Sequence, residues 1–188
     1  QIIDRPWFIE SHRLALFNER GTEVDVVLDL MIHDIDIILS LVNSDVKGIK
    51  AVGVPVVTSR IDIANARLQF ESGCVANVTA SRISTKNMRK IRIFQKDTYV
   101  SVDYAGRDVT IIGKKEQGVA LPIPGMTMLH KTFEKADALE AELAAFVDSV
   151  RTGRRPLVSA REGRRALRVA MDIIQDIKAT TDHVMADH

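Results

Sequence analysis

The sequence has little cysteine, little charge imbalance and no long charge-free apolar run, and each shortage excludes a class of protein. A single cysteine, Cys74, excludes an internal disulfide framework and a multi-cysteine zinc site, and it fits the reducing cytoplasm. The 26 basic and 25 acidic residues nearly cancel, so no nucleic acid or anionic membrane is expected as a partner. No charge-free apolar run approaches the roughly 18 residues that a transmembrane helix needs. The 188 residues, of which 46% are apolar, therefore have the profile of a soluble globular chain.

The middle of the chain alternates apolar and polar residues, which predicts β-strands. The alternation is clearest over residues 64–70 and 74–81, and it continues through "RKIRIFQ", "TYVSVDY" and "DVTIIG". These segments, separated by turn residues, predict a meander of five or six antiparallel strands between Val46 and Gly113. A strand-like piece, "PWFIESHRLA", precedes them.

Three segments have helical patterns. Residues 24–42 have the length and apolar density of a buried helix. A second helix near the C-terminus is predicted by apolar residues at helical spacing, namely Leu139, Leu143, Phe146, Val147 and Val150. The last helix begins at Ser159, where Glu162 completes a capping box. Its predicted buried stripe consists of Leu167, Met171, Ile174 and Ile177.

These elements predict an α+β fold. We expect one domain over residues 1–188, with helices packed on one face of an open-faced, mostly antiparallel sheet. No glycine-rich loop follows a strand and opens a helix, so the sequence contains no nucleotide-binding βαβ unit.

The helix predicted from residue 24 carries unusual charges in the stretch "DVVLDLMIHDID". At 100° per residue, one arc of about 80° contains Asp25, Asp29, His33, Asp36 and Ser40. Only Asp34 points the other way. Because burying an unpaired carboxylate costs several kcal/mol, this polar stripe must meet water, other stripe residues or a ligand.

The spacing of Asp29 and His33 suggests acid–base chemistry. Side chains four residues apart on a helix can touch, and a carboxylate beside an imidazole fixes its tautomer and raises its basicity. Two alternatives stay open. Asp25 and Asp29 can simply favour the helix N-terminus while His33 is a satisfied, partly buried histidine. Alternatively, Asp29, His33 and Asp36 can bind a divalent cation, although no further ligand is evident.

Two other features favour structural interpretations. Seven arginines lie between Arg151 and Arg168, but they alternate with helix-periodic apolar residues and lack aromatic partners. This pattern favours solvated helix faces over a nucleic-acid interface. Cys74 lies among Ala and Val on an alternating strand, which favours an inert core thiol over a nucleophile.

Three stretches together resemble the second domain of the Gfo/Idh/MocA family of oxidoreductases. They are "VDVVLDLMIHDIDIILSLV", with its D-x-x-x-H-x-x-D arrangement, "DIANARLQFESGCVANVTASRIS" and "ELAAFVDSVRTGRRPLVSAREGRRALRVAMDII". The resemblance implies an NAD(P)-dependent sugar or polyol dehydrogenase in which a Rossmann domain precedes the open-faced sheet. It also implies that His33 acts as acid or base on the substrate hydroxyl and that Asp29 orients His33 and contacts substrate. The sheet is then the substrate side and an oligomer interface.

The sequence departs from that family in one respect. The glycine-rich βαβ segment and the Glu-Lys-Pro motif, which carries a catalytic lysine, are absent. We therefore expect the C-terminal domain of a longer enzyme, with no cofactor-binding residues of its own and no activity alone.

Within the family, "FIESHRLALFNERGTEVDVVLDLMIHDIDI" is most similar to the branch that acts on nucleotide-linked amino sugars. This similarity implies oxidation of UDP-N-acetylglucosamine at C3. Arg13, His12 and Asp36 are the predicted substrate contacts, although Arg13 fits a structural ion pair equally well. The rival hypothesis is a non-catalytic oligomerisation or binding module, because an open sheet face carrying "ANVTAS" needs a cover.

Overall fold

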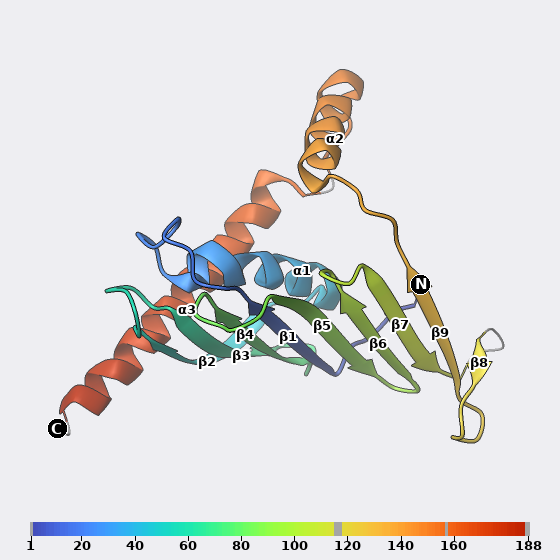
Figure 1. The fold of residues 1–188 in the computed structure, drawn as a ribbon, viewed down its shortest axis with the longest axis horizontal. Helices are drawn as coiled ribbons and strands as arrows, with labels where there is room; N and C mark the ends of the chain where they lie inside the picture. The colour runs from blue at the N-terminus through green and yellow to red at the C-terminus, as the bar shows by residue number, and fades with distance from the viewer. Residues whose placement is uncertain (1, 115–117, 157, 187–188) are drawn as a thin grey trace.

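The computed structural model describes residues 2–114, 118–156 and 158–186, with side chains described as far as residue 180. Its centre is one mixed sheet, in the order β2-β3-β4-β1-β5-β6-β7-β9-β8 (Figure 1). The strands are β1 (Phe8–Leu14), β2 (Val46–Val54), β3 (Ile63–Phe70), β4 (Val75–Ser81), β5 (Met88–Gln95), β6 (Thr98–Asp103), β7 (Asp108–Gly113), β8 (Val119–Ala120) and β9 (Thr127–Thr132). Every neighbouring pair is antiparallel except β1 and β4, which are parallel.

The position of strand β1 differs from the predicted meander, in which consecutive strands would be neighbours. It lies between β4 and β5, so that Glu10 is opposite Asn77 on one side and Arg92 on the other. The predicted strands from Val46 to Gly113 are confirmed, but they form two antiparallel groups separated by β1. The alternation within a strand shows which residues face the core, and it does not identify the strand's neighbours.

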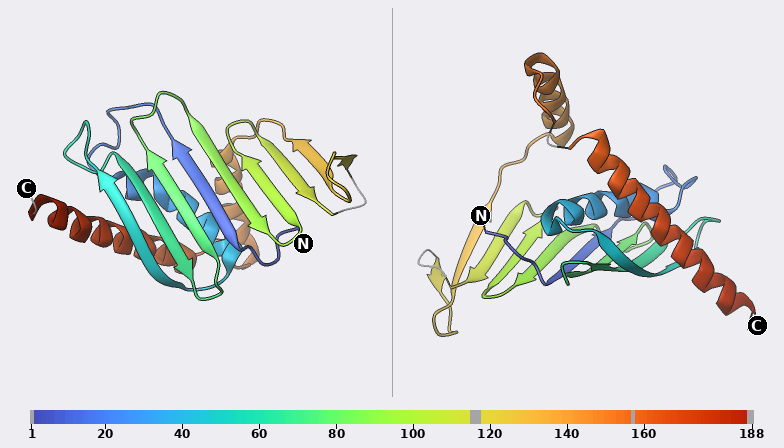
Figure 2. Two further views of the ribbon diagram at one scale, coloured as in Figure 1. Left: turned by 90° about the horizontal axis from the view of Figure 1, so that it is seen from below. Right: turned by 180° about the vertical axis from the view of Figure 1, so that it is seen from behind.

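Two helices cover one face of the sheet, and the other face is open (Figure 2). Helix α1 (Ile32–Val42) continues directly from η1 (Val27–Met31), a short π-helix, and α3 (Ala160–Ala186) packs on β2 and α1. The core between the helices and the sheet includes fully buried Ile35, Phe70 and Ile173. The predicted α+β class with an open-faced, mostly antiparallel sheet is confirmed.

Helix α3 starts as predicted, and two of the four residues of its predicted stripe, Ile174 and Ile177, are buried. The backbone N–H of Ser159 donates to Glu162 Oε2 at 2.8 Å, which forms the expected capping interaction. Leu167 and Met171, however, are 46% and 50% exposed. The stripe that is buried consists of Ala166, Val169, Ala170, Ile173, Ile174 and Ile177. Small alanines lie on the packed side because they let the helix approach the sheet closely, whereas the prediction selected the larger side chains.

Helix α2 (Ala138–Thr152) forms where predicted but does not pack on the sheet. Its N-cap residue Asp137 accepts hydrogen bonds from the N–H groups of Leu139 and Glu140, and it ends at Gly153 with φ 65°. The helix stands apart from the sheet in the views of Figures 1 and 2. All five apolar residues of its predicted stripe are exposed. None of the described helices combines the length and apolarity that a bilayer span requires.

Candidate functional site

The polar stripe begins at the π-helix η1, which sequence periodicity did not reveal. The i→i+5 hydrogen bonding of a π-helix widens the turn, and such turns occur frequently at functional sites. Asp25 is displaced from the predicted stripe, and its carboxylate accepts a hydrogen bond from the Ile61 N–H at 3.0 Å. Asp25 therefore does not belong to the helical stripe, because the helix begins at Val26, whereas the prediction assumed a regular α-helix through Asp25.

Asp29 lies in the π-helix beside two elements from elsewhere in the chain. Its side chain is 34% exposed, and its Oδ2 lies 4.0 Å from Nη2 of the buried Arg82. A Cβ placed on Gly21 would lie 3.3 Å from both carboxylate oxygens, so the backbone of Gly21 forms one wall around the carboxylate. The carboxylate thus faces solvent on one side only.

His33 is exposed on α1, one helical turn after Asp29. Over the part of the chain that the structure describes, neither a hydrogen bond nor an ion pair joins His33 to another group. The Asp29–His33 hydrogen bond that the spacing allows is therefore not formed among the described residues. Asp36 is partly buried on the same helix, and the hydroxyl of Ser40 donates to the Ile37 carbonyl. His33 is thus available to a group that approaches α1 from outside.

Asp34 points away from this surface, as expected, and contacts the sheet. It is buried, accepts a hydrogen bond from the Ser11 hydroxyl at 2.9 Å and forms an ion pair with Arg13. Arg13 therefore makes the structural ion pair that the sequence left open, and no contact tests its predicted role toward substrate. Tyr104, which the sequence did not single out, lies close by and is 42% exposed. Partial burial of its phenol and then the charge of Asp34 raise the pKa of that phenol, whereas the charge of Arg13 lowers it.

His12 lies on the opposite face of the sheet. Residues along a strand alternate between faces, and the buried Ile9 and Ser11 of β1 face the helices together with Arg13. His12 consequently faces the open side, where Thr79 and Lys90 are its register partners. One substrate molecule bound beside α1 cannot contact both Arg13 and His12 of the same chain.

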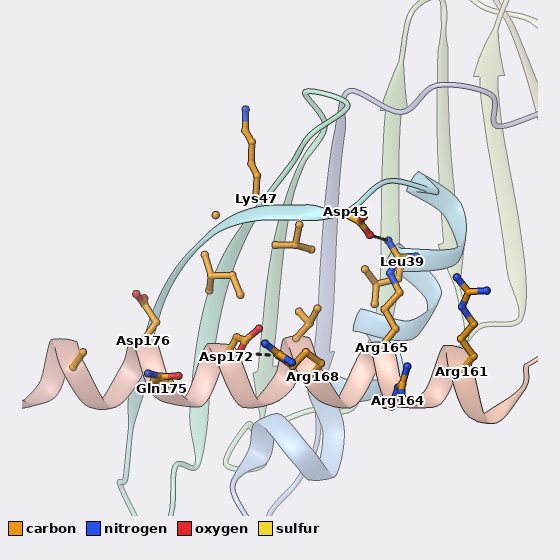
Figure 3. Close-up of a pocket in the computed structure, with 15 residues that line it drawn as sticks. Leu39, Asp45, Lys47, Arg161, Arg164, Arg165, Arg168, Asp172, Gln175 and Asp176 are labelled. Atoms are coloured by element: carbon orange, nitrogen blue, oxygen red, sulfur yellow. Dashed lines mark hydrogen bonds and ion pairs between the residues drawn. The ribbon is translucent and has the colours of Figure 1, made fainter.

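A groove of about 1070 Å³ lies between α3 and β2, away from these residues (Figure 3). Neither Asp29 nor His33 lines it. Its arginines include Arg165, which donates to the Ser44 carbonyl and pairs with Asp45, and Arg168, which pairs with Asp172. Among the described residues, Arg165 and Arg168 are thus ion-paired, whereas Arg161 and Arg164, which line the same groove, form no ion pair.

The described residues do not assemble a metal site. No group of three His, Cys, Asp or Glu side chains among them is arranged to hold a metal ion, and this includes Asp29, His33 and Asp36. Cys74 is buried, and burial raises the pKa of its thiol to about 11, which fits an inert core residue. The chemistry open to the exposed imidazole of His33 on α1 is proton exchange with a group that approaches from outside.

Comparison with known proteins relates this arrangement to a family. Residues 4–105 match the model of the GFO/IDH/MocA C-terminal domain. The chain is 36% identical over 174 residues to UDP-N-acetylglucosamine 3-dehydrogenase of Acidithiobacillus ferrooxidans, covering 93% of this chain and 55% of that relative. It is 28% identical over 150 residues to myo-inositol 2-dehydrogenase of Thermotoga maritima, covering 76% of this chain and 43% of that relative. The chain spans about half the length of the curated relatives it matches.

Solved structures agree with this assignment. The Acidithiobacillus ferrooxidans UDP-N-acetylglucosamine 3-dehydrogenase matches with a TM-score of 0.85 at 35% identity, covering 93% of this chain and 56% of that one. Levoglucosan dehydrogenase in complex with NADH matches with a TM-score of 0.79, covering 95% and 58%; at 14% identity this shows the fold alone. The resemblance predicted from the sequence is confirmed: the chain belongs to the Gfo/Idh/MocA family and corresponds to the C-terminal domain of its members.

Proposed function

We propose that this chain is the substrate-binding and acid–base domain of an NAD(P)-dependent dehydrogenase that oxidises a hydroxyl group of a sugar or nucleotide sugar. The observation that carries the proposal is the exposed imidazole of His33, on a helix whose other side is buried in the core. An imidazole exchanges protons near neutral pH, which alcohol oxidation requires. The 36% identity to a UDP-N-acetylglucosamine 3-dehydrogenase supports this reaction class.

Each side chain has a defined part in the reaction. As the alcohol becomes a carbonyl, the carbon loses a hydride and the oxygen loses a proton. His33 takes the hydroxyl proton, and in the reverse direction it returns that proton to the oxygen. Asp29 orients the imidazole and contacts the substrate, which requires the two side chains to approach when substrate binds. Bound NAD or NADP supplies the hydride acceptor.

The described residues offer no place for that cofactor. No glycine-rich loop connects a strand to a helix N-terminus, which is the arrangement that binds a dinucleotide phosphate. We therefore propose that a nucleotide-binding domain outside this chain holds the cofactor against the exposed side of α1. The 188-residue chain alone should form no NADH, and the complete enzyme should act in the cytoplasm.

The proposed substrate is a nucleotide-linked amino sugar, UDP-N-acetylglucosamine, oxidised at C3. The relative of that name supports this choice. Asp36 is the proposed second contact, because it is partly buried on α1 beside His33. Arg13 has N–H groups beyond those used for Asp34 and can contact a phosphate at the same side of the sheet. His12 lies on the open face, so it could contact substrate only in a site that a second protomer completes at that face.

The test is steady-state kinetics of the full-length enzyme that contains this chain. NADH or NADPH formation is followed with UDP-N-acetylglucosamine and with myo-inositol. His33→Ala should lower kcat by about 100-fold or more, the usual contribution of a positioned acid or base. His33→Gln should behave similarly, because an amide cannot take the proton.

His130→Ala is the matched control. His130 is exposed on β9 and hydrogen-bonds to Thr110 at 3.1 Å, on the open face of the sheet. The control should retain wild-type activity. If His33→Ala retains it as well, the acid–base proposal is wrong; loss of activity with an unchanged oligomer size supports it.

We further propose that the open face self-associates, which keeps the oligomerisation hypothesis alongside the catalytic one. A row of apolar side chains crosses six adjacent strands at matching register positions: Val75, Phe8, Phe94, Tyr99, Ile112 and Met128. The rings of Phe94 and Tyr99 lie 5.0 Å apart. Tyr99→Glu should reduce the molar mass in light scattering to that of a protomer, whereas a wild-type protein that is already monomeric would contradict this proposal.

The exposed apolar stripe of α2 is the proposed contact for the nucleotide-binding domain. The relatives are about twice as long as this chain, and α2 stands on the same side of the sheet as α1 (Figure 1). A domain placed against His33 can therefore also cover Leu143 and Phe146. Phe146→Glu in the full-length enzyme should weaken NAD binding and lower the melting temperature, whereas Glu142→Gln, an exposed change that adds no charge to the stripe, should not.

A further inference from the structure

Arg82 is a buried arginine that joins two loops near the candidate site. It directly follows β4, and its backbone N–H donates to the Asp62 carbonyl at 3.0 Å. Its Nη1 donates to the Gly21 carbonyl at 2.9 Å, and its Nη2 donates to the Val24 carbonyl at 2.6 Å. Both carbonyls belong to the loop that leads into η1. Arg82 therefore fixes the backbone immediately before the π-helix that carries Asp29.

The guanidinium of Arg82 also lies between two carboxylates. Nη2 is 4.0 Å from Asp29 Oδ2, and Nε is 4.0 Å from Asp62 Oδ1. The side chains of Arg82 and Asp62 are 5% and 0% exposed, so their charges are scarcely screened by water. A buried cation of this kind is stable only with nearby anions, and Asp29 is the one that also reaches solvent.

Asp62 cannot move to follow Asp29. Its Oδ2 accepts hydrogen bonds from the N–H groups of Val56, Val57 and Thr58, and its Oδ1 accepts one from the Thr58 hydroxyl. Burial by itself raises the pKa of Asp62, but these hydrogen bonds outweigh burial and lower the pKa to about 2. Asp62 is thus a fixed anion behind the guanidinium, and Asp29 is the carboxylate whose position Arg82 can control.

Gly21 contacts both Arg82 and the surroundings of Asp29. Its backbone lies against the Asp29 carboxylate, because a Cβ added to Gly21, whose φ is 84°, would lie 3.3 Å from both carboxylate oxygens. The carbonyl of Gly21 accepts a hydrogen bond from Arg82. The Nε of Arg82 has no hydrogen-bond partner among the described residues. Leaving a buried donor unpaired is costly, and such cases call for an explanation beyond packing.

We propose that Arg82 is a positioning residue that holds the Asp29 carboxylate and the Gly21 wall in the arrangement that serves His33. The inference rests on the proposed dehydrogenase function, because Asp29 is the group through which Arg82 acts. The Arg82 side chain is only 5% exposed, so the proposed role is exerted through Asp29 and not through a direct contact with substrate.

The test is a double-mutant cycle in the full-length enzyme, with Arg82→Met, Asp29→Asn and both changes together. Arg82→Met should lower kcat by about 100-fold, the effect expected when a catalytic group is misplaced by about 1 Å. In the Asp29→Asn background the same change should lower kcat by less than about threefold, because residues that act as one unit are not additive. Arg82→Lys, which keeps the cation but replaces the two-carbonyl fork, should give an intermediate kcat.

Controls separate positioning from folding and from failure of the proposed function. Arg60→Met removes an exposed arginine next to the Asp62 loop and should leave kcat unchanged. Equal losses of kcat in the wild-type and Asp29→Asn backgrounds would overturn the proposal. If Arg82→Met does not fold, the cycle is run with Arg82→Lys, and additivity there overturns the proposal equally. If Asp29→Asn and His33→Ala both retain full activity, the dehydrogenase mechanism itself has failed, and the positioning role falls with it.

Discussion

The guanidinium of Arg13 is ion-paired with the carboxylate of Asp34, the residue adjacent to His33 on α1. The two side chains are 13% and 3% exposed, and Ser11 donates a further hydrogen bond to Asp34 Oδ1. The pair joins β1, in the middle of the sheet, to the first turn of α1. The position of His33 relative to the sheet therefore depends on a buried charge pair on the opposite side of the same helical turn.

Asp34→Ala should destabilise the protein severely. It leaves the Arg13 cation buried without its anion, which typically costs about 3–5 kcal/mol. The unfolding free energy is measured by urea denaturation of Asp34→Ala and of the control Asp36→Ala, whose side chain is partly buried without an ion pair among the described residues. The control should cost less than about 1.5 kcal/mol. Equal losses in the two variants would contradict this account, whereas partial recovery in Arg13→Met/Asp34→Leu would support it.

Two glycines provide a matched test of the wall around Asp29. Gly21 and Gly73 have φ values of 84° and 88°, so an alanine is strained at either position and should cost about 1 kcal/mol of stability. A Cβ at Gly21 would meet the Asp29 carboxylate at 3.3 Å, whereas a Cβ at Gly73 would meet nothing within 4 Å. Gly21→Ala should therefore lower kcat at least about tenfold, and Gly73→Ala should leave it unchanged. Similar kcat values for the two variants would show that the wall is unimportant.

The positions of the helices and strands could be predicted from the sequence better than the pairing of the strands. Apolar alternation identified the strands from Val46 to Gly113, because each has one face on the core. The insertion of β1 between β4 and β5 depends on pairing between residues that are 67 to 86 positions apart, and no local pattern records it. The exposure of the apolar stripe of α2 was unpredictable for the same reason, because periodicity reveals an apolar face but not which element covers it.

The candidate site was predictable only in part. The helical periodicity correctly predicted that Asp34 points away from Asp29 and His33. It wrongly included Asp25, which lies before the helix and accepts a hydrogen bond from the Ile61 N–H. The contacts of Arg82 could not be predicted, because they involve Gly21 and Asp62, which are 61 and 20 residues away in the sequence.

Cys74 should resist modification in the folded protein. Burial raises the pKa of its thiol from 9.0 to about 11, so the reactive thiolate is scarce at pH 8. Labelling by iodoacetamide at pH 8 should be slow in buffer and fast in urea. Because the folded pKa is the higher one, the contribution of this thiol to stability is complete below about pH 9 and is lost as the pH rises through about 11. Equal labelling rates with and without urea would mean that Cys74 is accessible.

Asp62 should make the protein sensitive to acid. Its hydrogen bonds lower its pKa from 3.8 to about 2, so its contribution to stability is present above about pH 4 and is lost as the pH falls through about 2. Asp62→Asn cannot reproduce a carboxylate that accepts from three N–H groups and a hydroxyl, and it should cost about 3 kcal/mol at pH 7. Asp97→Asn, which breaks the exposed and solvent-screened pair with Lys114, should cost far less than Asp62→Asn. Urea denaturation of each variant between pH 2 and 7 measures these differences. The unfolding free energy of the wild type should fall more steeply below pH 4 than that of Asp62→Asn, and parallel curves would show that Asp62 is not the acid-sensitive group.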